Sequence, residues 1–177
     1  MIRTRVGYTG GSTQSPTYHD LGDHSETVQL DYDPKVITYE ELLGVFFSSH
    51  DASRRGASRQ YMSAVFFHDA ERERAALAAI EEETERLGKA IQTQVLPASS
   101  FYLAEDYHQK YALQGDGLVM ADFHRMYPNL MDVVDSTAAT RANAYLYGVG
   151  ELEQLQRELK SLGLSEESEQ RLLSRLE

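Results

Sequence analysis

The sequence predicts an α+β fold in which helices pack on one sheet, and three observations support this. Between residues 27 and 96, segments of strand and helix character alternate in the order β-α-β-α-β, and a further strand segment precedes them. The helices among them carry residues that start or stop a helix. The chain has 177 residues and a hydrophobic fraction of 41%, which is enough to build a buried core.

Four short segments have strand character, because they alternate apolar and polar residues or are apolar throughout. In the second of them, Val28, Leu30 and Tyr32 share one face of the expected strand. Pro34 and Pro97 stop the second and the fourth. The segments are residues 3–8, 27–33, 62–67 and 91–96.

The two helices between these strands are defined by their ends. Thr38 and Glu41 have the spacing of a capping box, in which each side chain accepts a hydrogen bond from the backbone N–H of the other residue. Residues 69–87 are rich in Ala and Glu, and Gly88 follows them as a C-terminal cap. We therefore expect one short helix and one long one.

The residues after Gly115 differ in character from those before. A less regular stretch comes first, and two helices are expected near the end. The first, residues 151–162, has leucines at helical spacing, which indicates core packing rather than a partner-binding face. Ser165 can cap the second. We expect a core of residues 1–114 and a helical C-terminal extension of residues 115–177 packed on it.

The charge and composition exclude several classes of partner. The formal net charge is −11, whereas binding to a nucleic-acid backbone or an anionic membrane requires clustered Lys and Arg. No apolar run approaches the ~18 residues of a membrane span, and the first residues lack the apolar core of a secretion signal. We expect a cytoplasmic protein with no nucleic-acid and no membrane partner. The chain contains no cysteine, so it has no thiol of its own.

Five short stretches rich in Gly, Tyr, His and acidic residues stand out from the rest. They are Arg5–Gly11, Pro16–Tyr18, His24–Glu26, Gln60–Ala64 and Phe101–Gln109. In this order they resemble the peptide-methionine (S)-S-oxide reductases, the A-type methionine sulfoxide reductases. The resemblance extends from Ile2 to about Tyr111.

The resemblance implies a ferredoxin-like two-layer sandwich and the repair of proteins after oxidative stress, by reduction of methionine-S-sulfoxide. In that family a thiolate attacks the sulfoxide sulfur, an acid protonates the oxygen, and thioredoxin or another thiol reduces the sulfenic acid. The partner is oxidised methionine in proteins or peptides, and no bound cofactor or metal is implied. The family's nucleophile lies in a Gly-Cys-Phe-Trp motif of the first β-α unit, which has no counterpart here. We therefore expect a fold that lacks this unit, and a truncated active site.

The resemblance also implies catalytic roles for three residues. Glu26 matches the family's acid, which requires partial burial to keep its proton near neutral pH. Tyr18 and Tyr61 match two tyrosines whose hydroxyls reach the sulfoxide oxygen. Without the resemblance, Glu26 would be a solvated residue at the start of a strand and the tyrosines would be half-buried packing residues. We expect these three to form the catalytic site.

Two departures from the family pattern concern the same site. The loop between Tyr18 and Glu26 is shorter than the family's loop. Residues 55–60 lack the Asn-Asp pair that supplies the family's second hydrogen-bonding acid, and the sequence assigns that role to no other residue.

Two further groups of polar residues have structural interpretations. Residues 105–108 are expected to begin a helix whose charges fix the loops around the site. A metal site is a minor alternative, because nothing in the sequence brings its possible ligands to one point. Those ligands would be His19, Asp23, His24 and Glu26.

Three explanations for the missing nucleophile stay open, in this order of preference. In the first, Met1 stands where family members carry a valine, and the full-length protein is active. In the second, the protein is a non-catalytic pseudoenzyme or binding module on the same fold. In the third, the residues from Asp135 onward replace the missing unit, with residues 144–147 as a replacement strand. As given, the chain is expected to be inactive as a reductase.

Overall fold

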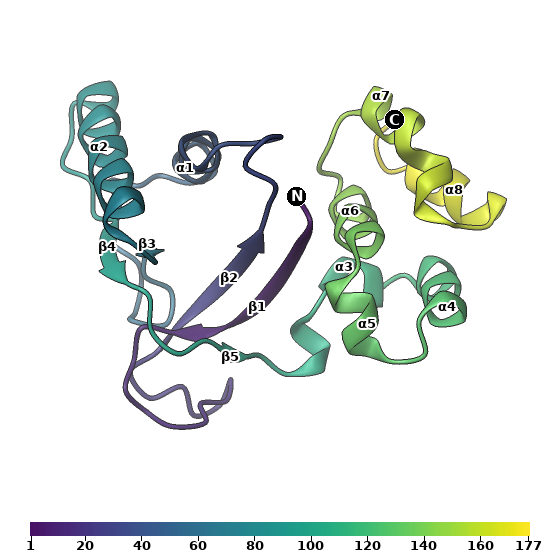
Figure 1. The fold of residues 1–177 in the computed structure, drawn as a ribbon, viewed down its shortest axis with the longest axis horizontal. Helices are drawn as coiled ribbons and strands as arrows, with labels where there is room; N and C mark the ends of the chain where they lie inside the picture. Colours follow the sequence, from purple (N-terminus) through teal and green to yellow (C-terminus); the bar gives the residue numbers. More distant parts are fainter. The chain divides into compact units, whose positions relative to one another are not determined.

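The computed structural model describes residues 1–177 and contains five strands and the helices labelled in Figure 1. The strands are β1 (Arg3–Thr9), β2 (Ser25–Asp31), β3 (Ala64–Phe67), β4 (Gln94–Pro97) and β5 (Tyr102–Leu103). One sheet has the strand order β2-β1-β5, and β3 pairs with β4 in a second sheet. The predicted α+β class is confirmed. The expectation of one sheet is wrong, because the strands form two separate sheets: neither β3 nor β4 is hydrogen-bonded to β1, β2 or β5.

The chain forms two compact units. The central unit contains residues 7–27 and 33–103. The C-terminal unit contains residues 1–6, 28–32 and 104–177.

In the central unit, the short strands are held in a definite register. β3 and β4 pair in parallel along their whole length. β1 and β5 pair antiparallel, with Gly7 opposite Leu103. Gly7 is required there, because a Cβ at this position would lie 2.3 Å from the carbonyl oxygen of Tyr102.

The two helices of the central unit begin where the sequence predicts, and the second also ends where it predicts. Helix α1 spans Tyr39–Ser48, and its capping box is present, with 3.1 Å from the Glu41 N–H to Thr38 Oγ1 and 2.7 Å from the Thr38 N–H to Glu41 Oε2. Helix α2 spans Ala70–Leu87 and ends at Gly88, whose φ of 62° is the left-handed conformation that favours glycine.

The C-terminal unit is built mainly from helices around their own apolar core. They are η1 (Asp106–His108), α3 (Tyr111–Gln114), α4 (Gly117–Met126), α5 (Leu130–Asp135), α6 (Thr137–Leu146), α7 (Leu152–Glu158), η2 (Leu159–Leu162) and α8 (Glu166–Leu173). Phe123 and Val133 are fully buried in this core, and so is Leu155 of the predicted leucine pattern. The core-packing interpretation of those leucines is confirmed, and Ser165 caps α8 as predicted.

Three helices of this unit were not predicted. Helices α4, α5 and α6 occupy the stretch that looks irregular in the sequence, and residues 144–146 belong to α6 rather than to a replacement strand. For α4 and α6 the physical reason is a local cap. Asp116 and Ser136 accept hydrogen bonds from the backbone N–H groups three residues on, which allows short helices to start there.

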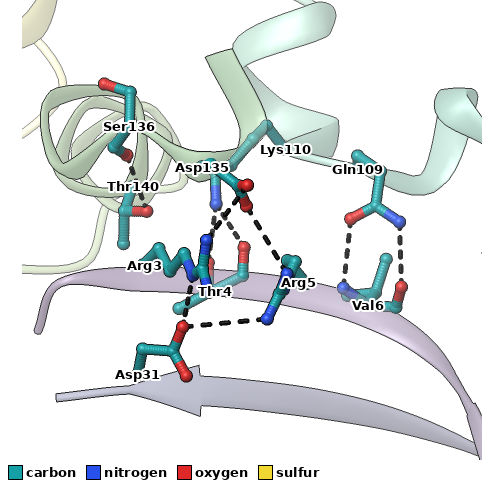
Figure 2. Close-up of polar contacts among 10 residues, drawn as sticks. All are labelled: Arg3, Thr4, Arg5, Val6, Asp31, Gln109, Lys110, Asp135, Ser136 and Thr140. Atoms are coloured by element: carbon teal, nitrogen blue, oxygen red, sulfur yellow. Dashed lines mark hydrogen bonds and ion pairs between the residues drawn. The ribbon is translucent and has the colours of Figure 1, made fainter. Parts of the chain in front are cut away.

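Charged side chains connect the strand residues of the C-terminal unit to its helices (Figure 2). Arg3 pairs with Asp31 and, at 3.0 Å, with Asp135 at the end of α5. Arg5 lies 3.7 Å from Asp31 and 3.8 Å from Asp135, so two arginines share two carboxylates. Because each charge meets more than one opposite charge, this network holds β1 and β2 to α5 within the unit.

Two residues before α3 bind the backbone of β1 (Figure 2). The Gln109 side chain donates to the Val6 carbonyl at 2.8 Å and accepts from the Val6 N–H at 3.1 Å. Lys110 is 5% exposed, and its Nζ donates to the carbonyl and the hydroxyl of Thr4, the latter at 2.9 Å. Gln109 and Lys110 therefore hold β1 to the segment before α3.

The apolar face of β2 is left open in the C-terminal unit. Val28 is 54% exposed and Leu30 is 37% exposed. Helix α5 instead contacts the charged side chain of Arg3 on β1, through Asp135. The third explanation, in which the residues from Asp135 onward cover the sheet in place of a missing unit, therefore lacks support.

None of the helices is both long enough and apolar enough to cross a membrane.

Candidate functional site

The central unit brings the three predicted site residues together. Glu26 is the second residue of β2, Tyr18 lies in the loop after β1, and Tyr61 lies just before β3. A hydrogen bond with the Tyr18 side chain raises the pKa of Tyr61, and partial loss of hydration and the negative charge of Glu26 raise it further. The hydroxyls of Tyr18 and Tyr61 and the carboxylate of Glu26 therefore lie close enough to interact electrostatically.

Gln60 joins two of these residues and was not among the predicted ones. Its side-chain amide donates to Glu26 Oε1 at 2.6 Å, and its carbonyl accepts from the Glu26 N–H at 3.0 Å. Its side chain also bonds to Tyr61, an interaction that by itself lowers the pKa of that tyrosine. The signal in the sequence is the position of Gln60 inside one of the five stretches, directly before Tyr61.

The loop that carries Tyr18 is fixed at both ends by Asp23 and His24. The Asp23 carboxylate accepts hydrogen bonds of 2.8–3.0 Å from the backbone and hydroxyl groups of Ser12 and Thr13. These bonds, those to Thr13 first, hold the pKa of Asp23 well below its usual range. Nδ1 of His24 accepts from the Gly11 N–H at 3.2 Å, so its Nε2–H donates to the Thr13 carbonyl at 2.8 Å. The loop is therefore anchored without a metal.

The minor metal alternative has no geometric support. The nitrogens of His24 and the oxygens of Asp23 are already used in the bonds that hold the loop. The chain holds no group of three His, Cys, Asp or Glu side chains that could bind a metal ion.

Arg59 connects the segment before Tyr61 to the same loop. Its guanidinium donates to the Gly10 carbonyl at 2.8 Å and to the Asp23 carbonyl at 3.2 Å. In return, the Ser25 hydroxyl donates to the Arg59 carbonyl at 2.7 Å. Three separate segments are thus held in one place. A sequence pattern could not identify Arg59, because its guanidinium bonds to backbone carbonyls that are distant in the sequence.

The site is more open than the sequence predicts. Tyr18 is half-buried, Tyr61 is 52% exposed, and Glu26 is exposed rather than partly buried. The expected burial of Glu26 is wrong in this structure. Its carboxylate accepts a hydrogen bond from the polar amide of Gln60 and is otherwise open to solvent.

Residues 105–108 form the short turn η1 of the C-terminal unit, and the neighbouring Gln109 and Lys110 bind β1 as described above. His108 lies 4.0 Å from Glu105 across this turn. The expected helix start is present as η1 (Asp106–His108), and the expectation that the charges of residues 105–108 fix the loops around the site stays a prediction.

Comparison of the sequence with protein families gives one match, to peptide methionine sulfoxide reductase, over residues 1–133. A peptide methionine sulfoxide reductase of Drosophila melanogaster is 41% identical over 93% of this chain and 67% of that protein. The peptide methionine sulfoxide reductase MsrA of Methanosarcina acetivorans is 44% identical over 63% of this chain and 65% of that protein.

Solved structures give the same result for the fold. Methionine sulfoxide reductase A of Corynebacterium diphtheriae matches with a TM-score of 0.58 and 32% identity, over 65% of this chain and 64% of that one. Reduced Mxr1 from Saccharomyces cerevisiae matches with a TM-score of 0.59 and 31% identity, over 64% of this chain and 70% of that one. The chain spans 47% to 67% of the length of the first curated relatives that it matches.

Proposed function

Because the chain belongs to the peptide methionine sulfoxide reductase family, we propose that it supplies the acid and tyrosine side of a site that reduces methionine-S-sulfoxide in proteins. The observation that supports this most strongly is the meeting of Tyr18, Glu26 and Tyr61 from three separate segments. Two hydroxyl donors and one acid suit a sulfoxide oxygen, which carries partial negative charge and must gain a proton as its bond to sulfur breaks.

In this proposal the oxygen is held and protonated from one side. The hydroxyls of Tyr18 and Tyr61 donate hydrogen bonds to it, and Glu26 transfers the proton. A tyrosine phenol, whose ordinary pKa is 10.0, is protonated and able to donate at neutral pH, and the pKa of Tyr61 is raised from that value.

A thiolate on the other side would attack the sulfoxide sulfur. The oxygen passes to the thiol sulfur, so the products are methionine and a sulfenic acid. Two further thiols then reduce the sulfenic acid to a thiol and water and are themselves oxidised to a disulfide. Since the chain has no cysteine, the nucleophile has to come from residues other than these 177. The final reductant is thioredoxin or another thiol, and we place this repair in the cytoplasm, where such thiols are kept reduced.

The rival function is a binding module that recognises oxidised methionine without reducing it. The absence of cysteine is the specific observation that favours it. It predicts the same contacts to the sulfoxide oxygen but no chemistry.

Two experiments separate these functions. The first is to read the coding sequence upstream of Met1 in frame for a Gly-Cys-Phe-Trp motif. The reductase proposal expects the motif, whereas a stop codon with no motif leaves the binding module. The second is a dithiothreitol-dependent assay with a methionine-S-sulfoxide peptide. The 177-residue chain should give no turnover, and a product that includes the motif should give turnover that Glu26→Gln lowers by a factor of about 100. Turnover by the 177-residue chain itself would contradict the mechanism.

A further inference from the structure

Gln60 occupies a position between the proposed acid and a proposed tyrosine. It holds Glu26 twice, through the side-chain bond of 2.6 Å to Oε1 and through the backbone bond of 3.0 Å from the Glu26 N–H. The same side chain bonds to Tyr61. A primary amide has two N–H donors, so the Gln60 side chain can donate to the Glu26 carboxylate and to the Tyr61 hydroxyl at the same time.

The bond to Oε1 makes the two oxygens of the carboxyl group different. An amide N–H requires a lone pair, so the oxygen that accepts from Gln60 is held as an acceptor, and a proton on Glu26 is best carried by Oε2. Glu26 is exposed, and without such a partner its carboxyl would rotate freely between water-bonded orientations.

Gln60 stays neutral at every pH at which the protein is folded, which distinguishes it from a carboxylate. A second acid beside Glu26 would repel its negative charge and compete for the proton. An amide orients the carboxylate without doing either. The stretch of residues 55–60 lacks the family's second acid, and Gln60 ends that stretch.

We propose that Gln60 is a positioning residue, which fixes the carboxyl of Glu26 so that Oε2 faces the sulfoxide oxygen with its proton. This role rests on the proposed function of Glu26. Gln60 itself does not contact the reacting atoms. Its backbone bond sets where Glu26 begins β2, and its side-chain bond sets how the carboxyl is turned.

NMR of the 177-residue chain tests the contact directly. One side-chain N–H of Gln60 should resonate downfield of the exposed Gln92 amide, which is the internal control, because it donates to a charged oxygen. Glu26→Gln should return it to the position of the Gln92 signal. Equal Gln60 and Gln92 signals in the parent chain would overturn the proposal.

Binding of a methionine-S-sulfoxide peptide tests the role. Gln60→Met keeps the length of the side chain and removes its N–H groups, and it should weaken binding by about tenfold. The matched control Gln92→Met should leave binding unchanged. Equal affinity of Gln60→Met and the parent chain would overturn the role of Gln60 and leave the proposed function standing. A parent chain that binds no sulfoxide peptide would instead overturn the proposed function, and the role of Gln60 with it.

Discussion

The side chains of Tyr18 and Tyr61 are hydrogen-bonded to each other, although one belongs to the loop after β1 and the other to the segment before β3. This bond is the largest cause of the raised pKa of Tyr61. The two hydroxyls therefore form a pair whose state can be followed by titrating one phenol.

Removing the partner should bring Tyr61 back toward ordinary behaviour. In Tyr18→Phe, the pKa of Tyr61 should fall toward the usual value of 10.0, because the bond that favours the protonated phenol is gone. NMR of the Tyr61 ring during a pH titration measures it. Tyr147→Phe is the control, since Tyr147 is 71% exposed and lies in the other unit. An unchanged Tyr61 titration would contradict the pairing.

The Asp23 carboxylate should order the loop that carries Tyr18. In Asp23→Ala, the backbone amides of Ser12 and Thr13 lose their acceptor, so their hydrogen exchange should become faster by about tenfold or more. Since the folded-state pKa of Asp23 is depressed, its stabilising effect is present above the ordinary value of 3.8 and is lost as the pH falls below it. Loop exchange that is equal in the two proteins at pH 7 would remove Asp23 from this role.

The buried amine of Lys110 should make stability depend on pH in the alkaline range. Burial lowers the pKa of Lys110 to about 8 from an ordinary value of 10.5. Between these two values the unfolded chain binds the proton more tightly than the folded chain, so stability rises with pH. Urea denaturation from pH 8 upward should show this rise in the parent chain and a smaller one in Lys110→Met. The exposed Lys89→Met is the control, and parallel curves for the parent and Lys110→Met would contradict the burial.

The helical core of the C-terminal unit should be as sensitive to cavities as any protein core. Phe123 is 0% exposed, so Phe123→Ala should lower the free energy of unfolding by about 3–5 kcal/mol. The exposed Tyr147→Ala should change it by about 0.5 kcal/mol or less. Urea denaturation followed by circular dichroism gives both values. A similar loss in the two variants would show that Phe123 is not part of a packed core.

The elements that could be predicted from the sequence are those whose ends are local. The side chains of Thr38 and Glu41 bond to each other's backbone, and Gly88 stops α2 through its own backbone, so neighbouring residues suffice to locate both helix ends. Helices α4 to α6 were missed because they are short, and the start of α4 or α6 is marked by only one capping residue, Asp116 or Ser136. The division into two sheets depends on pairing between distant strands, which alternation within one strand does not specify.

For the site, too, some residues could be predicted from the sequence and others could not. Tyr18, Glu26 and Tyr61 were found through the resemblance to a family, since nothing in their spacing distinguishes them from packing residues. Gln60 and Arg59 were missed because their importance lies in contacts with Glu26 and with the loop after β1, which only the folded chain brings near. The exposure of Glu26 could not be predicted either, because it depends on how other segments of the folded chain pack around this residue.

The most direct test of the central claim is a titration of the 177-residue chain with two peptides that differ only in the configuration of the sulfoxide sulfur, followed by NMR. The account predicts that the S-sulfoxide binds more tightly than the R-sulfoxide, shifts the signals of Tyr18, Glu26 and Tyr61, and binds about tenfold more weakly to Glu26→Gln. Equal binding of the two epimers, or shifts confined to residues outside this site, would contradict it.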